Sequence, residues 1–281
     1  MRTLALDTMP EVETQIIRLL RTHTPSQKLK SLAGMRLLAK NLVMSGLRSQ
    51  YPNASQAELK RHLFRRRLGH ELAESVFAAN NSVNLEEEKN MLSEPELISL
   101  VAQRLEELRI PYFVSGSVAS IIHGEERFTK DADLVVRIFP FHIPALIKTF
   151  EPGFVISADA VQDAITRRYA FNIIHLATAF KIDLFPIHEE DEFEFDALER
   201  CRRQHIGSGE IWVATAEDII LAKLIWFRKG GSVSEQQWRD VLGVLKVQGA
   251  RLDFAYLAGQ ARRFGLADLL EKAREDAGEI V

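Results

Sequence analysis

The stretch Tyr112-Phe-Val-Ser-Gly-Ser-Val-Ala-Ser-Ile-Ile-His-Gly-Glu-Glu-Arg-Phe-Thr-Lys-Asp-Ala-Asp-Leu-Val-Val136 decides how the fold of this chain is interpreted. It predicts an apolar strand, a Gly-Ser turn that opens a short helix, and a second strand that carries two aspartates. Strand side chains alternate between faces, so Asp131 and Asp133 project from the same face. Two carboxylates on one face can hold a hard cation such as magnesium, and Gly116-Ser117 leaves room for a phosphate near the backbone.

The composition indicates a folded globular protein. With 281 residues, 46% of them hydrophobic, the chain can form one large domain or two modest ones. Its single cysteine, Cys201, rules out an intramolecular disulfide and suits a reducing cytosol. The first seven residues lack the apolar core of a signal peptide, and the longest uncharged stretch, Ile110 to Gly124, is broken by Pro111 and too short to span a bilayer. We expect a cytoplasmic protein without a membrane segment.

The overall charge of -3 hides an asymmetry between the two parts of the chain. Residues 1–80 hold 13 Lys and Arg against 6 Asp and Glu, a net charge of +7, and the remainder holds 23 against 33, a net charge of -10. A basic helical module followed by an acidic part suggests either contact with nucleic acid or electrostatic docking between the two parts. The arginines at 61 and 65–67 are the candidates for gripping RNA, with solvation or docking as the alternatives.

The order of predicted elements favours an α+β fold. Capping boxes at Ser55 and Ser93 and a cap at Thr215 each open a helix. A mixed block of strands and helices lies between two helical segments, without the regular alternation of a doubly wound parallel sheet. We therefore expect a basic helical module (1–80), a linker (81–93), a small mixed-sheet core (94–214) and a C-terminal helical extension (215–281).

Two strands in the core come in close succession. The runs Tyr169 to Leu176 and Phe180 to Phe185 predict an antiparallel hairpin through Ala177-Thr178-Ala179. The second run contains Lys181-Ile-Asp183, which places a third aspartate on a core strand. A final short strand is expected at Ile211–Ala214.

The spacing of these groups carries a family resemblance. Gly116-Ser117, thirteen intervening residues, Asp131-x-Asp133 and the later strand aspartate Asp183 resemble the nucleotidyltransferase superfamily with the DNA polymerase beta type of fold. Within it, the chain is similar to the minimal bacterial AbiEii-type nucleotidyltransferases over roughly residues 95 to 250. That closer similarity rests on Arg127-x-Thr129-x-Asp131-x-Asp133, on Ala216-Glu-Asp-Ile-Ile-Leu-Ala-Lys223 and on Trp238-Arg-Asp240.

The resemblance implies two-metal nucleotidyl transfer with release of pyrophosphate. Asp131, Asp133 and Asp183 would be the catalytic, metal-ligating acids for two magnesium ions. An NTP such as ATP would be bound by the Gly-Ser turn, whose helix N-terminus attracts phosphate, and by cations around it. The nucleotide-binding candidates are Gly116, Ser117, Arg127, Thr129, Lys130 and Lys223, and Arg228 and Asp240 would complete the wall of the site.

The acceptor is expected to be a hydroxyl of RNA, such as tRNA, or of a protein, in a toxin-antitoxin or phage-defence setting with a possible cognate partner protein. Two alternatives stay open: a non-catalytic regulatory or antitoxin-like protein with the same fold, and a nucleotidyltransferase of small molecules of the aminoglycoside type. His123 is interpreted as a packed histidine rather than a phosphate ligand. The three tryptophans, Trp212, Trp226 and Trp238, are interpreted as core residues.

Overall fold

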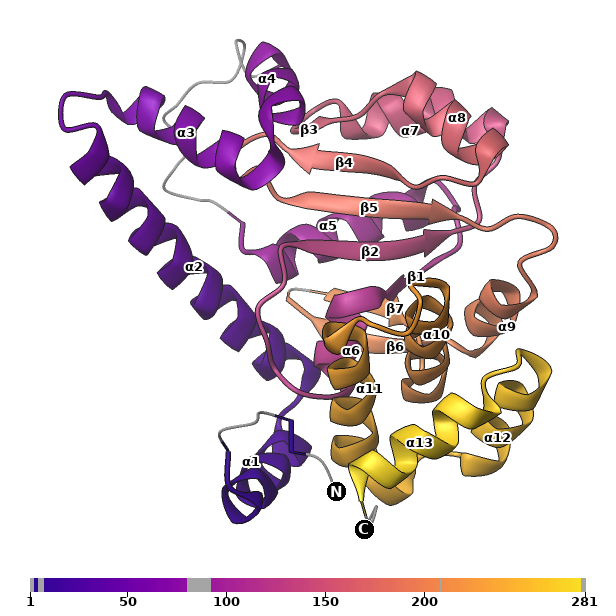
Figure 1. The fold of residues 1–281 in the computed structure, drawn as a ribbon. Helices are drawn as coiled ribbons and strands as arrows, with labels where there is room; N and C mark the ends of the chain where they lie inside the picture. Colours follow the sequence, from indigo (N-terminus) through magenta and orange to yellow (C-terminus); the bar gives the residue numbers. More distant parts are fainter. Residues whose placement is uncertain (1–2, 5–7, 80–91, 208, 279–281) are drawn as a thin grey trace. The chain divides into compact units, whose positions relative to one another are not determined.

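The computed structural model describes residues 3–4, 8–79, 92–207 and 209–278 (Figure 1). The chain forms two compact units, each assembled from separate stretches of sequence. Unit 1 comprises Met1–Leu29, Phe113–Thr129 and Glu192–Val281, and unit 2 comprises Lys30–Tyr112 and Lys130–Asp191. The expected linker, 81–93, lies almost entirely outside the described residues.

Four strands of unit 2 pair in the order β3-β4-β5-β2. They are β2 (Asp131–Val136), β3 (Phe154–Val155), β4 (Phe171–His175) and β5 (Lys181–Pro186). The β4–β5 hairpin is antiparallel, as predicted, whereas β2 and β5 are parallel. This combination of parallel and antiparallel pairing, with helical segments before and after it in the sequence, confirms the expected α+β class with a mixed sheet.

Alternation along β2 and β5 separates an apolar face from a polar one. Ala132 and Leu134 on β2, and Ile182 and Leu184 on β5, are completely buried. The residues between them, which include the aspartates, are only half-buried. Because the two strands are in register, the polar positions of both lie on the same face.

Unit 2 also contains helices, two of which begin after the capping residues that the sequence predicts. The helices are most of α2 (Pro25–Gln50), then α3 (Gln56–Leu68), α4 (His70–Ala79), α5 (Glu94–Glu107), η3 (Pro140–His142), α7 (Ile143–Phe150) and α8 (Ala158–Arg167). Ser55 and Ser93 both form the reciprocal capping boxes expected from the sequence. In the Ser55 box, the Glu58 carboxylate accepts from the Ser55 backbone N–H, and the Ser55 hydroxyl accepts from the Glu58 N–H.

The helices α3 and α4 are part of the core of unit 2 (Figure 1). Phe64 of α3 and Val76 of α4 are buried in one apolar cluster with Ile174 of β4 and with Leu176 and Ala179, which follow it. Removing the N-terminal helices would expose this cluster to water. Point substitutions are therefore the suitable way to test what these helices do.

Substituting Phe64→Ala is expected to lower the free energy of unfolding by about 3–5 kcal/mol, because a large aromatic side chain would leave a cavity against β4. Phe64 is 2% exposed and stacks on Phe77 with ring centroids 5.7 Å apart. Urea unfolding of the variant measures the loss. Leu42→Ala, at a 66% exposed position of α2, serves as the control. Equal effects of the two substitutions would contradict the packing of α3 against the sheet.

Unit 1 contains three strands in the order β1-β7-β6 and most of the C-terminal helices. The strands are β1 (Tyr112–Ser115), β6 (Arg202–Ile206) and β7 (Gly209–Val213). The helices are α1 (Pro10–Thr22), α6 (Gly116–His123), α9 (Glu192–Arg200), α10 (Ala216–Lys229), α11 (Glu235–Gln248), η4 (Gly249–Arg251), α12 (Phe254–Arg263) and α13 (Ala267–Ala277). The C-terminal helical segment thus occurs as predicted.

Strand β6 was not predicted from the sequence. Its five residues, Arg-Arg-Gln-His-Ile, are polar except for the last and show no apolar alternation. Antiparallel pairing with β7 gives this segment its strand conformation, since each of its residues from Arg202 to Ile206 has a partner on β7. Tertiary pairing overrides the weak local preference.

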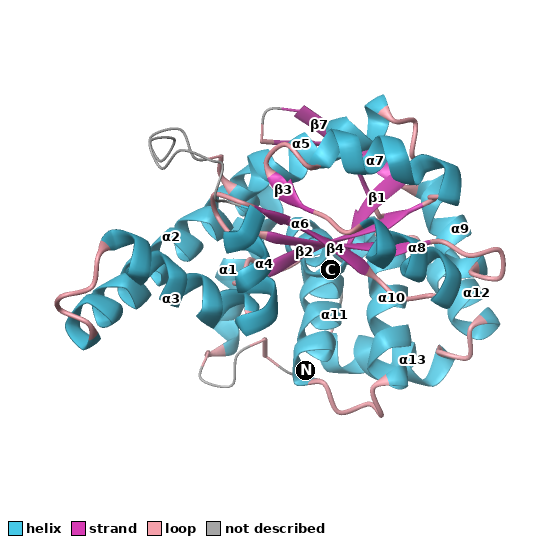
Figure 2. Ribbon diagram, turned by 90° about the horizontal axis from the view of Figure 1, so that it is seen from above, coloured by secondary structure: helices cyan, strands magenta, loops and turns pink. Residues whose placement is uncertain are grey.

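Helices α10 and α11 run side by side and both contact α6 (Figure 2). The close approach of α6 to α11 depends on Gly124 at the end of α6, where an added Cβ would lie 2.9 Å from the Val244 backbone nitrogen of α11. Trp238 of α11 is buried, as predicted, but the core prediction for Trp226 is wrong, because its side chain is 54% exposed. Trp226 has apolar neighbours in the sequence of α10, so the sequence gives no sign that its side chain is exposed.

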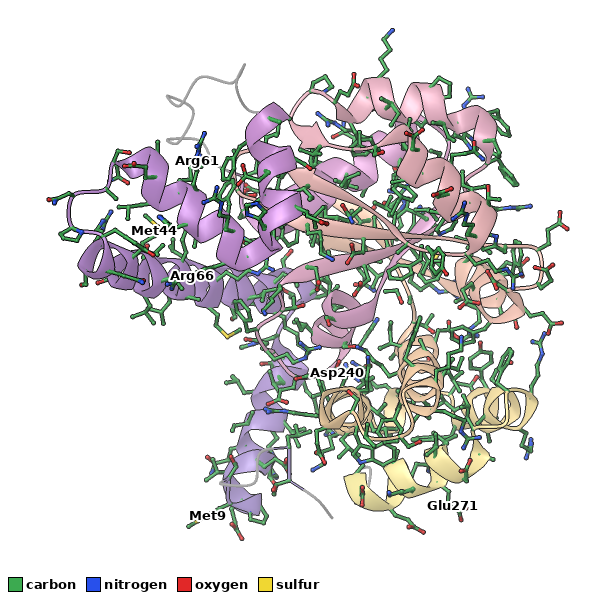
Figure 3. The ribbon with its side chains drawn as sticks, turned by 45° about the horizontal axis from the view of Figure 1, so that its top comes forward. Met9, Met44, Arg61, Arg66, Asp240 and Glu271 are labelled. Atoms are coloured by element: carbon green, nitrogen blue, oxygen red, sulfur yellow. The ribbon has the colours of Figure 1, made fainter. Side chains whose placement is uncertain are left out.

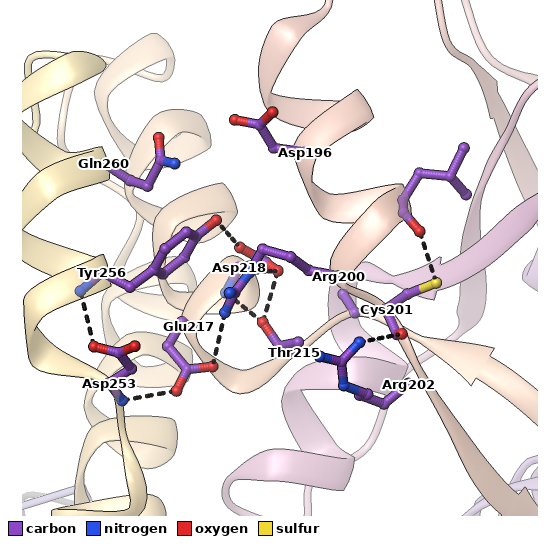
Figure 4. Close-up of polar contacts among 12 residues, drawn as sticks. Asp196, Arg200, Cys201, Arg202, Thr215, Glu217, Asp218, Asp253, Tyr256 and Gln260 are labelled. Carbon is purple, nitrogen blue, oxygen red and sulfur yellow. Dashed lines mark hydrogen bonds and ion pairs between the residues drawn. The ribbon is translucent and has the colours of Figure 1, made fainter.

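A polar network fixes the beginning of α10 (Figure 4). The Asp218 carboxylate is 1% exposed and accepts hydrogen bonds from the Thr215 hydroxyl at 2.6 Å, the Tyr256 hydroxyl at 2.7 Å and Arg200 Nε at 3.3 Å. Thr215 is the helix cap that the sequence predicts. Burial, together with the bond to the Asp218 carboxylate, raises the pKa of Tyr256 well above its ordinary value. The network connects α9, α10 and α12, which makes its role structural.

Cys201 is a buried free thiol whose pKa burial raises. Among the described helices, none has the length and apolar composition to cross a membrane.

Candidate functional site

The three aspartates of unit 2 share the polar face of two paired strands. Asp133 of β2 lies directly across from Asp183 of β5, and Asp131 lies across from Lys181. All four positions are half-buried. The sequence predicts that the three acids lie on strands and that Asp131 and Asp133 share a face. The parallel register is what brings Asp183 beside Asp133 on one face.

A lysine that is not among the predicted site residues contacts this acidic face. Lys181 Nζ lies 2.5 Å from Asp183 Oδ2 and 3.8 Å from Asp131 Oδ2. Lys181 is two positions before Asp183, so the period of two that groups the aspartates also puts this lysine on their face. The signal was therefore present in the sequence, although no role was assigned to it.

Partial burial distinguishes Asp183 from an ordinary surface carboxylate. Burial raises its pKa, the bond to Lys181 opposes that shift, and the negative charge of Asp131 adds to it. A carboxylate with a raised pKa accepts a proton more readily than a solvated one.

The donor set of the acidic face fits a hard divalent cation. All three acids offer carboxylate oxygens, which magnesium prefers as protein ligands. The Lys181 ammonium already contacts two of them and so acts as a stand-in cation. In the described part of the chain, however, no three or more His, Cys, Asp or Glu side chains lie close enough together to be the ligands of one metal ion.

Unit 1 carries the Gly-Ser turn that the sequence places at the start of a helix. Gly116 has a φ of 55°, in the left-handed region that glycine adopts without strain, and it begins α6 directly after β1. Ser117 is therefore in the first turn of α6, where backbone N–H groups and the helix dipole favour an anion. The Gly116 carbonyl accepts from the Ser120 hydroxyl at 2.8 Å, which stabilises the turn.

A buried ionic network in unit 1 includes four residues singled out from the sequence. Arg127 donates to both oxygens of Asp240, at 2.7 and 2.8 Å, and its Nη2 donates to the Ser117 hydroxyl at 2.9 Å. Lys223 Nζ lies 2.7 Å from Asp240 Oδ2. Figure 3 labels Asp240 on α11. The network thus connects α10 and α11 to the beginning of α6.

Asp240 is the centre of this network. Burial alone would raise the pKa of its carboxyl, but the bonds to Arg127 and Lys223 outweigh that effect and lower it. The Asp240 side chain is only 3% exposed and that of Lys223 only 7%. One carboxylate thus holds two cations, and one of them, Arg127, also reaches the Ser117 hydroxyl.

The remaining sequence candidates lie in different environments. Thr129 is buried, whereas Lys130 is exposed. Arg228 donates to the Asp268 carboxylate and the Gly265 carbonyl, so its guanidinium is bound to the loop and helix that follow α12. The structure therefore gives Arg228 a local partner and does not bring it into the Asp240 network.

The arginines of α3, of which Figure 3 labels Arg61 and Arg66, have partners within unit 2. Arg65 pairs with Glu74, Arg66 donates to the Gln50 side chain and the guanidinium of Arg61 lies over the Phe77 ring. Arg67 donates to the Thr178 carbonyl at 3.0 Å. RNA binding by this helix stays a prediction.

His123 is packed, as the sequence interpretation has it. Its Nε2 lies 2.7 Å from the Ala214 carbonyl, so this nitrogen carries the hydrogen. Burial lowers its pKa to about 4 from 6.5. The folded protein thus keeps His123 neutral at pH values where the unfolded chain protonates it.

Because the unfolded chain binds more protons between pH 6.5 and 4, His123 makes the folded state less stable as the pH falls through this range. The loss should amount to about 3 kcal/mol, from 1.36 kcal/mol per pKa unit. We expect His123→Gln, which keeps a side-chain donor, to remove that part of the acid sensitivity. Urea unfolding at several pH values measures it. Parallel stability curves for the two proteins would contradict the assignment.

This chain is similar to known proteins in its structure rather than in its sequence. No protein-family model matches this chain. A search of curated proteins finds no similar sequence. Eight chains of solved structures do match. One is an antigenic nucleotidyltransferase-like protein from Paracoccidioides brasiliensis, with 17% identity and a TM-score of 0.43 over 64% of this chain and 92% of the other.

Two more of the solved structures are named for antibiotics. The antibiotic-resistance factor ANT(2'')-Ia has 14% identity and a TM-score of 0.42, over 64% of this chain and 98% of the other. The lincosamide antibiotic adenylyltransferase LnuA, bound to lincomycin, has 16% identity and a TM-score of 0.36, over 56% of this chain and 99% of the other.

Proposed function

We propose that this protein is a nucleotidyltransferase that moves a nucleoside monophosphate from an NTP to a hydroxyl group of RNA or of a protein. The observation that supports this most is the cross-strand pair Asp133–Asp183 with Asp131 on the same face. Three carboxylates on one face of paired parallel strands are unfavourable for stability alone, since they repel one another, and they suit chemistry that uses a cation.

The acids of unit 2 would hold magnesium through Asp131, Asp133 and Asp183. When bound, the ions would lower the pKa of the acceptor hydroxyl and neutralise the charge of the triphosphate and of the pyrophosphate leaving group. Asp183 would also offer a carboxylate oxygen that can accept the proton of the acceptor hydroxyl.

The residues of unit 1 suit the binding of a triphosphate. The Ser117 hydroxyl and the backbone N–H groups of the first turn of α6 would donate to phosphate oxygens. Arg127 and Lys223 would supply positive charge, with Asp240 keeping both side chains in place. Buried Thr129 would support the chain that follows Arg127. Exposed Lys130, which belongs to unit 2, would supply further positive charge.

The resemblance in sequence motifs favours a toxin-antitoxin or phage-defence setting, with a cognate partner protein. In that setting the acceptor is a macromolecule, and tRNA is our first choice. Small-molecule acceptors form the second arm of the test because they share the same chemistry and differ only in the hydroxyl that attacks.

The test is transfer of label from each of four α-labelled NTPs, with magnesium, to total RNA, to proteins of a cell lysate, or to a panel of aminoglycosides and lincosamides. Wild type is compared with Asp131→Asn and with the exposed control Asp159→Asn. We expect label on RNA or protein with wild type and the control, and none with Asp131→Asn. Transfer that persists in Asp131→Asn would refute the assignment of the acids, and no transfer by wild type to any acceptor would favour a non-catalytic binding protein.

A further inference from the structure

The acidic face of unit 2 contains its own counter-ion. Lys181 Nζ is 2.5 Å from Asp183 Oδ2 and 3.8 Å from Asp131 Oδ2, so one ammonium bridges acids of two neighbouring strands. Its side chain is 28% exposed, and those of Asp131 and Asp183 are 34% and 17% exposed. The Lys181 side chain is thus partly open to solvent where it bridges Asp131 and Asp183.

Two other cations near the acids are anchored by their surroundings. The Arg36 side chain is 5% exposed, lies 3.3 Å from Glu94 and has its guanidinium 4.6 Å from the centre of the Phe180 ring. Arg67 lies 5.8 Å from the same ring centre and donates to the Thr178 carbonyl. Both guanidinium groups are within electrostatic reach of Asp131. Stacking and hydrogen bonding hold them in place.

Lys181 differs from these arginines in its freedom to move. A lysine has a flexible four-carbon stem and a compact ammonium that water solvates well, so it can leave a carboxylate pair at little cost when it is partly exposed. A divalent cation carries twice the charge of the lysine ammonium and binds several carboxylate oxygens at once. The two cations would compete for the same oxygens.

We propose that Lys181 is the internal counter-ion of the acidic face and that a divalent cation binds there by displacing its ammonium. This inference rests on the proposed function, since it concerns the metal that function needs. The competition makes the acids bind metal weakly while no nucleotide is present. It therefore couples metal occupancy to the arrival of the NTP, whose phosphates attract both the ion and the released ammonium.

The experiment is a titration of the full-length protein with Mn²⁺, without nucleotide, followed by the loss of the free-ion signal in electron paramagnetic resonance. Lys181→Met should bind Mn²⁺ about tenfold more tightly than wild type, because a neighbouring positive charge is gone. Lys181→Arg keeps the charge and should not gain affinity. Lys148→Met, at an exposed position of α7, is the matched control and should equal wild type.

Thermal melting gives a second readout that a purely structural lysine would not produce. In EDTA, Lys181→Met should melt below wild type, since three carboxylates repel one another without the ammonium. Saturating Mn²⁺ should remove most of that difference. An unchanged Mn²⁺ affinity, or a melting difference that is the same with and without Mn²⁺, would overturn the proposal and leave the metal site intact.

The failure of the proposed function has a different signature. If Asp183→Asn binds Mn²⁺ as tightly as wild type, or if wild type binds no Mn²⁺, the acids are not metal ligands. Both the proposed function and the displacement of Lys181 are then refuted. If wild type binds Mn²⁺ through Asp183 but transfers no nucleotide, the reaction is refuted while the displacement of Lys181 is still decided by the titration.

Discussion

Substituting either Asp133→Asn or Asp183→Asn is expected to reduce nucleotidyl transfer about a thousandfold, the upper end of the range found when one preorganised group that stabilises a transition state is removed. The two residues lie directly across from each other on β2 and β5. The physical reason is that an amide keeps the shape of the side chain but supplies neither the negative charge nor the proton acceptor. Initial rates with saturating NTP and acceptor measure the effect.

The double variant decides whether the two acids act as one unit. If they do, Asp133→Asn together with Asp183→Asn should be no slower than the slower single variant, because groups that act together lose their effect together. The exposed control Asp159→Asn on α8 should retain full activity, and circular dichroism should show all variants folded. Losses that multiply in the double variant would show that the acids serve separate steps.

Substituting Asp240→Ala is expected to lower the free energy of unfolding by about 3–5 kcal/mol, the usual cost of removing one partner from a buried ion pair. The substitution leaves Lys223, 7% exposed, and Arg127, 16% exposed, without their shared carboxylate. Chemical denaturation measures the loss. Asp268→Ala, which removes a 70% exposed partner of Arg228, is the control and should leave stability unchanged.

Adding Lys223→Met to Asp240→Ala should recover part of the lost stability, since the uncompensated buried charge is then gone. Strictly additive effects would contradict a direct interaction between Lys223 and Asp240. The same two variants also report on nucleotide binding. Asp240→Ala frees Arg127 from the position in which it reaches the Ser117 hydroxyl, so the KM for the NTP should rise.

Local chemistry accounts for the elements that could be predicted. The capping boxes at Ser55 and Ser93 are short-range hydrogen bonds between residues three apart, so they occur where the sequence places them. The hairpin of β4 and β5 likewise depends on neighbours in the chain. By contrast, polar β6 and exposed Trp226 depend on what packs or pairs with them from elsewhere, and both were missed.

The sequence by itself determined which chemical groups this protein has and which share a face: Asp131 with Asp133, and Lys181 with Asp183, because strand side chains alternate with a period of two. Only the tertiary structure decided that β2 and β5 pair in parallel with Asp133 across from Asp183, and that Asp240 holds Arg127 and Lys223. The Asp133–Asp183 pair and the Arg127–Asp240 contact join residues fifty or more positions apart, and Lys223 and Asp240 come from two different helices. The strand register follows from the burial of whole apolar faces, such as Ala132 and Leu134 against the core, rather than from any local pattern.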